Sequence, residues 1–376
     1  APSPETATMA DKSDAEARGK PMLGAGGKAG LLAGVAGIST VAGVSAAKAL
    51  RQRRLINDAY EGEDFKLLDA DRGCVVTTPD GTPLVVREVG PVTAPLTVVF
   101  THGFCVRMGS FHFQRVALAQ RLGTDVRMVF YDQRGHGQSA AAAPETYTVP
   151  QLGVDLETVL QVMVPVGPVV LVGHSMGGMA ALAYLARPSA ERPVDPQGLV
   201  LAATTAGKLT HQGLGRLLAT PGTGALLRLA NHIPKQALNL LAGPVCSTLS
   251  RAWPEQRTML TAVAGAAAST PIPTAAGFLP TLRSYDQHRT LGDIRAKTVV
   301  ISGAADPLIP ASHSHELARA IPRAAHLHLP HAGHMLPREV PQVINKAIRR
   351  AMSAEGADGL AACRRDIAVR SRRCVS

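Results

Sequence analysis

Aromatic residues are scarce in this sequence: 7 Phe, 5 Tyr and 1 Trp make up 3% of its 376 residues. The formal net charge of +11 would suit a nucleic-acid partner, but neither a stacking motif nor a zinc motif accompanies the basic residues. We therefore expect no nucleic-acid partner. An anionic membrane surface is the better explanation of the basic excess.

Cysteine is also sparse, and its five positions are far apart without any CxxC pair. They are Cys74, Cys105, Cys246, Cys363 and Cys374. An odd, scattered set excludes a disulfide framework and gives no zinc-ligand spacing, so a reducing compartment fits best. The sequence gives no reason to expect a metal or an organic cofactor.

Charge is missing altogether from one stretch near the beginning of the chain. Residues 1–28 are polar and lack apolar periodicity, which predicts a disordered leader. Residues 29–47 carry no charge, and four basic residues, Lys48, Arg51, Arg53 and Arg54, follow them. Residues 29–54 are thus a candidate membrane anchor, and the basic flank would keep the rest of the chain in the cytoplasm.

The Ala- and Gly-rich composition of 29–47 leaves other interpretations of this stretch open. It is only marginally hydrophobic and near the lower length limit for a membrane span. A packed helix and a cleaved signal peptide are the alternatives, although the basic cluster opposes export. A soluble cytoplasmic protein is the corresponding alternative location.

From about Phe65 onward, short β-branched runs alternate with helical segments. With 46% hydrophobic and 18% charged residues, this pattern predicts an α/β fold, a mostly parallel sheet flanked by helices. Cys74–Thr78 and Pro83–Glu88 flank a Pro-Asp-Gly-Thr turn and predict an antiparallel hairpin. Buried strands are expected at Leu96–Thr101, Arg127–Tyr131, Pro168–Val172, Gly198–Ala202, Thr298–Ser302 and Ala325–Leu329.

The interval 204–290 contains no comparable strand run and is broken by several prolines. We interpret it as short helices inserted between core strands, so that 65–203 and 291–350 form the two parts of the core. Residues 351–376 form a basic tail with five arginines from Arg364 to Arg373, suited either to solvent or to a membrane surface.

The clearest chemical motif is Gly173-His174-Ser175-Met176-Gly177, which follows an apolar strand and precedes a helical run. The flanking glycines suit a backbone that turns sharply at Ser175 and leaves its hydroxyl exposed. We therefore predict that Ser175 is a nucleophile.

A serine nucleophile needs a neutral imidazole to accept its proton and a carboxylate to orient that imidazole. His334 lies in the loop after the last strand run, and Gly333 should allow it to approach the serine loop closely. His331 is expected to be a surface loop residue. Asp306 follows the preceding strand, whereas Asp286 and Asp293 lie before it, at the wrong end.

Negative charge on the substrate carbonyl oxygen requires backbone N–H donors. Met176 supplies one directly after the nucleophile. Phe104, in the loop after Leu96–Thr101, is the expected source of the second. In that loop His102 is expected to be structural, and Cys105 to be a small packing residue.

These motifs, together with Asp132–Ser139 and Gly303–Pro310, resemble the α/β-hydrolase family in its esterase and lipase branch, over about Asp71 to Met352. The order Ser175, Asp306, His334 is that of this family. The resemblance implies that 204–290 is a lid over an acyl pocket and that Asp132–Ser139 is structural.

The expected activity is hydrolysis of small-molecule carboxylic esters with apolar or lipid-like acyl groups, through an acyl-enzyme on Ser175. A C–C bond hydrolase or a cofactor-free perhydrolase would use the same three residues. A membrane-tethered binding protein without catalysis is the alternative from another class.

Overall fold

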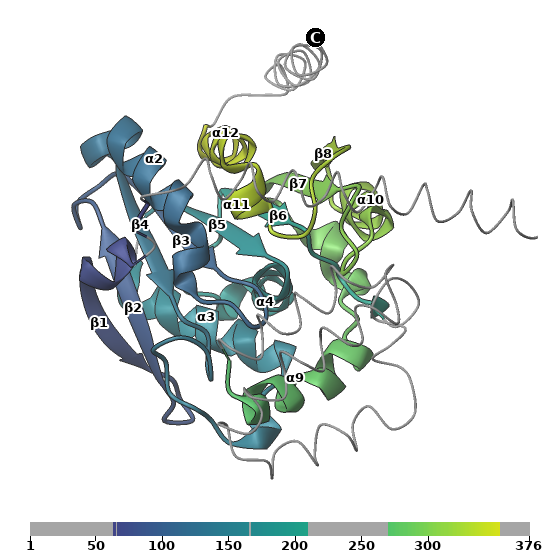
Figure 1. Ribbon diagram of the computed structural model, residues 1–376, viewed down its shortest axis with the longest axis horizontal. Coiled ribbons are helices and arrows are strands. Elements are labelled where there is room, and N and C mark those ends of the chain that lie inside the picture. The colour runs from purple at the N-terminus through teal and green to yellow at the C-terminus, as the bar shows by residue number, and fades with distance from the viewer. Residues whose placement is uncertain (1–62, 65, 165–166, 210–269, 354–376) are drawn as a thin grey trace, which may run out of the picture. The chain divides into compact units, whose positions relative to one another are not determined.

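A computed structural model of the chain describes residues 63–64, 66–164, 167–209 and 270–353 (Figure 1). The chain divides into two units, 1–61 and 62–376, and all of the described residues belong to the second. The expected leader and anchor, residues 210–269 of the expected lid and nearly all of the basic tail lie outside the described residues.

The described residues form one sheet of eight strands in the order β1-β2-β4-β3-β5-β6-β7-β8. Strand β2 pairs antiparallel with β1 and β4, and every other neighbouring pair is parallel. The strands are β1 (Arg72–Thr77), β2 (Pro83–Val89), β3 (Leu96–Thr101), β4 (Val126–Tyr131), β5 (Val169–His174), β6 (Gly198–Ala202), β7 (Lys297–Gly303) and β8 (Ala325–Leu329).

These strands confirm the expected mostly parallel α/β sheet and its antiparallel hairpin, in which Val75 lies opposite Val85. One expectation was wrong. Strand β8 is not buried on both faces, because it is the last strand of the sheet and exposes His328. Its alternating burial is that of an edge strand with one covered side.

Helices pack on both faces of the sheet (Figure 1). Their bounds are α2 (His112–Leu122), α3 (Val149–Met163), α4 (Met176–Leu185), α9 (Ile272–Ser284), α10 (Ala311–Ala320), α11 (Leu336–Glu339) and α12 (Pro341–Met352). On one face, Val98 and Phe100 of β3 join an apolar core with residues of α2 and α12. On the other, Val99 joins residues of α3, α4 and α10.

The alternation of Val98, Val99 and Phe100 between two cores explains why the central strands read as continuous apolar runs. It also fixes where chemistry can occur. Because β3 and β5–β8 are parallel, the loops that follow β3, β5, β7 and β8 leave the sheet at the same edge.

Candidate active site

Ser175 lies at a strained turn between β5 and α4. Its φ is 53°, in the left-handed region that non-glycine residues seldom adopt. A Cβ on Gly177 would lie 2.0 Å from the carbonyl oxygen of Thr101, and one on Gly173 would lie 2.5 Å from the Cα of Gly178. Both positions therefore require glycine: Gly177 lets the turn approach the end of β3, and Gly173 lets the strand and the start of α4 pack closely within the turn.

Four hydrogen bonds hold the backbone of Ser175 in this conformation. Its N–H donates to the carbonyl of Ala202 (2.9 Å). Its carbonyl accepts from the hydroxyl of Thr204 (2.6 Å) and from the N–H groups of Gly178 (2.9 Å) and Met179 (3.3 Å). Thr204 is fully buried. Such over-determined bonding maintains a strained backbone.

The structure brings His334 and Asp306 to Ser175 in one chain of hydrogen bonds. His334 Nε2 lies 3.0 Å from Ser175 Oγ, and His334 Nδ1 lies 2.8 Å from Asp306 Oδ2. The other carboxylate oxygen, Oδ1, accepts the N–H groups of Leu308 (2.8 Å) and Ile309 (3.0 Å). Asp306 is thus fixed by its own loop, with Oδ2 left to bind the imidazole.

His174 is a contributor to the site that the sequence did not reveal. Its Nε2 donates to the carbonyl of His334 (2.8 Å), and burial lowers its pKa to about 3. The ring is therefore neutral and connects the serine turn to the histidine loop. The residue stood inside the motif, but only the folded arrangement shows which carbonyl it binds.

Hydrogen bonds to two buried histidines join the loop that follows β3 to the loop that follows β4. Gln133 N–H donates to His102 Nε2 (2.9 Å), and Cys105 N–H donates to His136 Nε2 (3.2 Å). Burial lowers the pKa of His102 to about 4 and that of His136 to about 3, so both rings accept these bonds in the neutral form.

Phe104 lies between these anchored neighbours, and its ring packs edge-on against His136 and Phe278. Met176 is the first residue of α4, so its N–H belongs to the helix-terminal amides that have no partner within the helix. Cys105 is buried with its pKa raised to about 12, which keeps it a thiol. Phe104 and Met176 remain our predicted oxyanion donors.

The residues set aside in the sequence lie elsewhere. His331 is exposed, and its neighbour His334 is the one that contacts Ser175. Asp286 pairs with His288 (2.7 Å) at an exposed position. Asp293 is exposed and lines a cavity away from Ser175.

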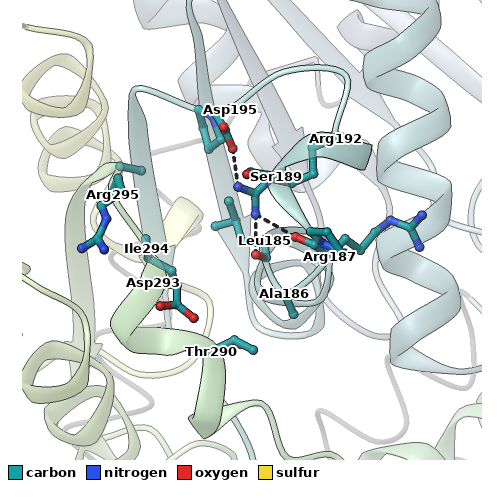
Figure 2. A pocket seen from close by; sticks show the side chains of 13 residues that line it. Leu185, Ala186, Arg187, Ser189, Arg192, Asp195, Thr290, Asp293, Ile294 and Arg295 are labelled. Carbon is teal, nitrogen blue, oxygen red and sulfur yellow. Dashed lines mark hydrogen bonds and ion pairs between the residues drawn. The ribbon is translucent and has the colours of Figure 1, made fainter.

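That cavity, of about 490 Å³, lies beside the start of β6 and β7, at the opposite edge of the sheet (Figure 2). Arg192 occupies its centre, paired with Asp195 (2.5 Å) and bonded to the carbonyls of Leu185 and Arg187 at the end of α4 (Figure 2). The charge of Arg192 is therefore balanced by Asp195.

Within the described ranges, no three His, Cys, Asp or Glu side chains are grouped so that they could hold a metal ion. In the same part of the chain, no helix combines the length and apolarity needed to cross a membrane, and residues 29–47 fall outside that part.

Known proteins share this sequence pattern and architecture. The chain is 28% identical over 263 residues to sn-1-specific diacylglycerol lipase ABHD11 of Mus musculus, covering 69% of this chain and 81% of that relative. It is 30% identical over 163 residues to a monoacylglycerol lipase of Mycolicibacterium smegmatis, covering 41% and 54% of the two chains.

A solved structure of a hydrolase from Pseudomonas aeruginosa matches with a TM-score of 0.56 at 25% identity, covering 76% of this chain and all of that one. A family model described as the alpha/beta hydrolase fold matches residues 97–339, well over half of the chain. The chain belongs to the alpha/beta hydrolase fold family.

Proposed function

We propose that this hydrolase cleaves carboxylic esters through an acyl-enzyme on Ser175. The observation that carries the proposal is the chain of contacts from Ser175 Oγ to His334 Nε2 (3.0 Å) and from His334 Nδ1 to Asp306 (2.8 Å). A serine at a strained, glycine-flanked turn with an imidazole and a carboxylate in line is the arrangement that acyl transfer requires.

In the proposed reaction, Ser175 Oγ attacks the ester carbonyl while His334 Nε2 takes the hydroxyl proton. The carbonyl oxygen becomes negatively charged, and in this proposal the N–H groups of Met176 and Phe104 stabilise it. The intermediate then expels the alcohol, which receives its proton from His334. Water attacks the resulting acyl-enzyme by the same proton route and releases the acid, which restores the serine.

The acyl group is proposed to be apolar. Met176, Met179, Phe278 and Ile309 belong to one buried apolar cluster, with Phe104 and Leu308 packed against it. These residues adjoin the serine turn, the oxyanion loop and the Asp306 loop. The names of the two relatives, a diacylglycerol lipase and a monoacylglycerol lipase, support acylglycerols or similar lipid esters as the substrate class.

Replacement of the proposed nucleophile tests this function. We expect Ser175→Ala to lower hydrolysis of p-nitrophenyl esters by several orders of magnitude, because the attacking atom is lost, while the protein remains folded. The matched control is Ser189→Ala, at an exposed site beside the distant cavity. A series of chain lengths from acetate to laurate defines the acyl preference.

A fluorophosphonate probe should label the wild-type protein on Ser175 and leave Ser175→Ala unlabelled. Near-wild-type turnover in Ser175→Ala would falsify the proposal. A wild-type protein that takes up the probe but hydrolyses no ester would favour a C–C bond hydrolase or a perhydrolase. A protein that shows neither labelling nor turnover would favour a non-catalytic binding protein.

We further propose that residues 29–54 hold the enzyme at the cytoplasmic face of a membrane. The support is the uncharged run 29–47 and the basic residues from Lys48 to Arg54 that follow it. Fractionation of cells expressing the full chain or a chain lacking residues 1–54 tests this. We expect only the full chain to sediment with membranes; equal solubility of the two in low and high salt would exclude the anchor.

A further inference from the structure

The loop that carries His334 is bound on both sides by one carboxylate. Glu339, the last residue of α11, accepts the N–H of Gly333 at Oε2 (2.6 Å) and the N–H of Met335 at Oε1 (2.9 Å). These two amides flank His334 directly. The Glu339 side chain therefore points back along the chain and bridges the residues on either side of His334.

Gly333 lies directly against the Glu339 carboxylate. A Cβ at that position would lie 3.0 Å from Oε1 and 3.2 Å from Oε2 of Glu339, so the carboxylate would have to shift by a few tenths of an ångström. The expected role of Gly333 in letting His334 approach the serine loop stays a prediction.

The carbonyl of His334 is fixed as well. It accepts from His174 Nε2 (2.8 Å) and from the N–H of Leu336 (2.9 Å). The carbonyl of His334 and the N–H groups of the residues before and after it, Gly333 and Met335, therefore all have partners. The imidazole leaves a backbone that cannot rotate without breaking a charge-assisted hydrogen bond.

We propose that Glu339 is a positioning residue for ester hydrolysis, which holds the backbone of His334 so that Nε2 stays within reach of Ser175 Oγ. The inference rests on the proposed function. Glu339 touches neither the substrate nor the reacting atoms in this arrangement. It acts through the two amides, and it contributes to catalysis by keeping the imidazole of His334 aligned with Ser175 Oγ.

A purely structural alternative is that Glu339 only closes the turn of α11. The two roles differ in what they change. A loss of stability reduces the fraction of folded enzyme and leaves each folded molecule fully active. A loss of alignment lowers kcat per folded site and leaves substrate binding, and therefore KM, nearly unchanged.

Glu339→Gln and Glu339→Ala separate these roles. Glutamine has nearly the same volume but only one acceptor oxygen, so it can bind one amide and must turn its NH₂ group toward the other. Alanine binds neither. We expect kcat per probe-titrated site to fall about 10- to 100-fold, more for alanine than for glutamine, with KM within about twofold of wild type.

Glu191→Gln is the matched control, because it changes an exposed glutamate whose ion-pair partner is Arg187 (3.6 Å) and which is remote from the His334 loop. It should retain wild-type kcat. Wild-type kcat per titrated site in both Glu339 variants would overturn the proposal. So would a decrease that matches the loss of folded protein.

Hydrogen exchange measured by mass spectrometry provides a readout that does not depend on turnover. The amides of Gly333 and Met335 should exchange slowly in the wild type and at least tenfold faster in Glu339→Ala, while amides of β5 stay unchanged. If the wild type neither labels nor hydrolyses esters, the proposed function fails, yet exchange still reports whether Glu339 holds the loop. Unchanged exchange of the Gly333 and Met335 amides in Glu339→Ala would show that Glu339 does not hold this loop.

Discussion

Asp306 shows how one carboxylate can be fixed by its own loop and still serve another residue. Oδ1 accepts the N–H groups of Leu308 and Ile309, and Oδ2 accepts from His334 Nδ1 (2.8 Å). The side chain is almost fully buried. Since Nδ1 must carry the proton to make this bond, Nε2 is left unprotonated and able to accept the proton of Ser175.

Asp306→Asn should therefore lower kcat for ester hydrolysis by about 10³–10⁴-fold, because an amide can donate to Nδ1 and favour the wrong tautomer. Size and burial are nearly unchanged, so the thermal midpoint should shift little. Steady-state kinetics alongside thermal unfolding provide the measurement. Asp293→Asn, at an exposed position by the distant cavity, is the control; if that change were the damaging one, the orienting carboxylate would have been misassigned.

At the scale of single elements, much of the fold could be predicted because local patterns decide it. The run from Leu96 to Thr101 and the run from Gly198 to Ala202 are strands with the expected bounds. Ser175, Asp306 and His334 could be selected because each follows a strand, and parallel strands bring such loops to one edge. These three residues are far apart in the sequence, but the parallel order of the strands brings them together at that edge.

The arrangement of elements was harder to foresee because it depends on contacts between distant segments. Arg134, fully buried, binds Asp155 of α3 (2.6 Å) and Asp80 of the β1–β2 turn (2.7 Å). No local pattern indicates that these three residues converge. Likewise Glu339 stood in an ordinary helical stretch, and only the fold shows that its carboxylate returns to the His334 loop. The edge position of β8 could not be predicted for the same reason, because the sequence of one strand does not determine its position in the sheet.

At the scale of the whole molecule, three buried histidines make folding depend on pH. Burial lowers the pKa of His102 to about 4 and the pKa values of His136 and His174 to about 3. Each ring is neutral in the folded protein, where its unprotonated nitrogen accepts an amide N–H or, in His174, lies beside Gly103. In the unfolded chain the same residues titrate near pH 6.5.

The sign of the effect follows from proton uptake. Below pH 6.5 the unfolded chain binds protons that the folded protein does not, so acid favours unfolding until the pH reaches the lowered folded-state pKa values. Each histidine contributes about half of 1.4 kcal/mol per pH unit at pH 6.5 and approaches that limit near pH 5, where the three together reach about 4 kcal/mol per pH unit. The free energy of unfolding should therefore fall steeply between pH 6.5 and 5.

Urea unfolding at a series of pH values between 7.5 and 5 measures this slope. Asp132 and Asp155, whose pKa values are raised by burial, take up protons in the folded state more readily than in the unfolded chain and oppose the trend in more acidic solution. His136→Gln keeps an acceptor for the Cys105 amide but cannot titrate, so it should reduce the slope by about one third. A stability that is constant from pH 7 to 5 would contradict the prediction for all three rings. A slope that His136→Gln does not alter would contradict it for His136.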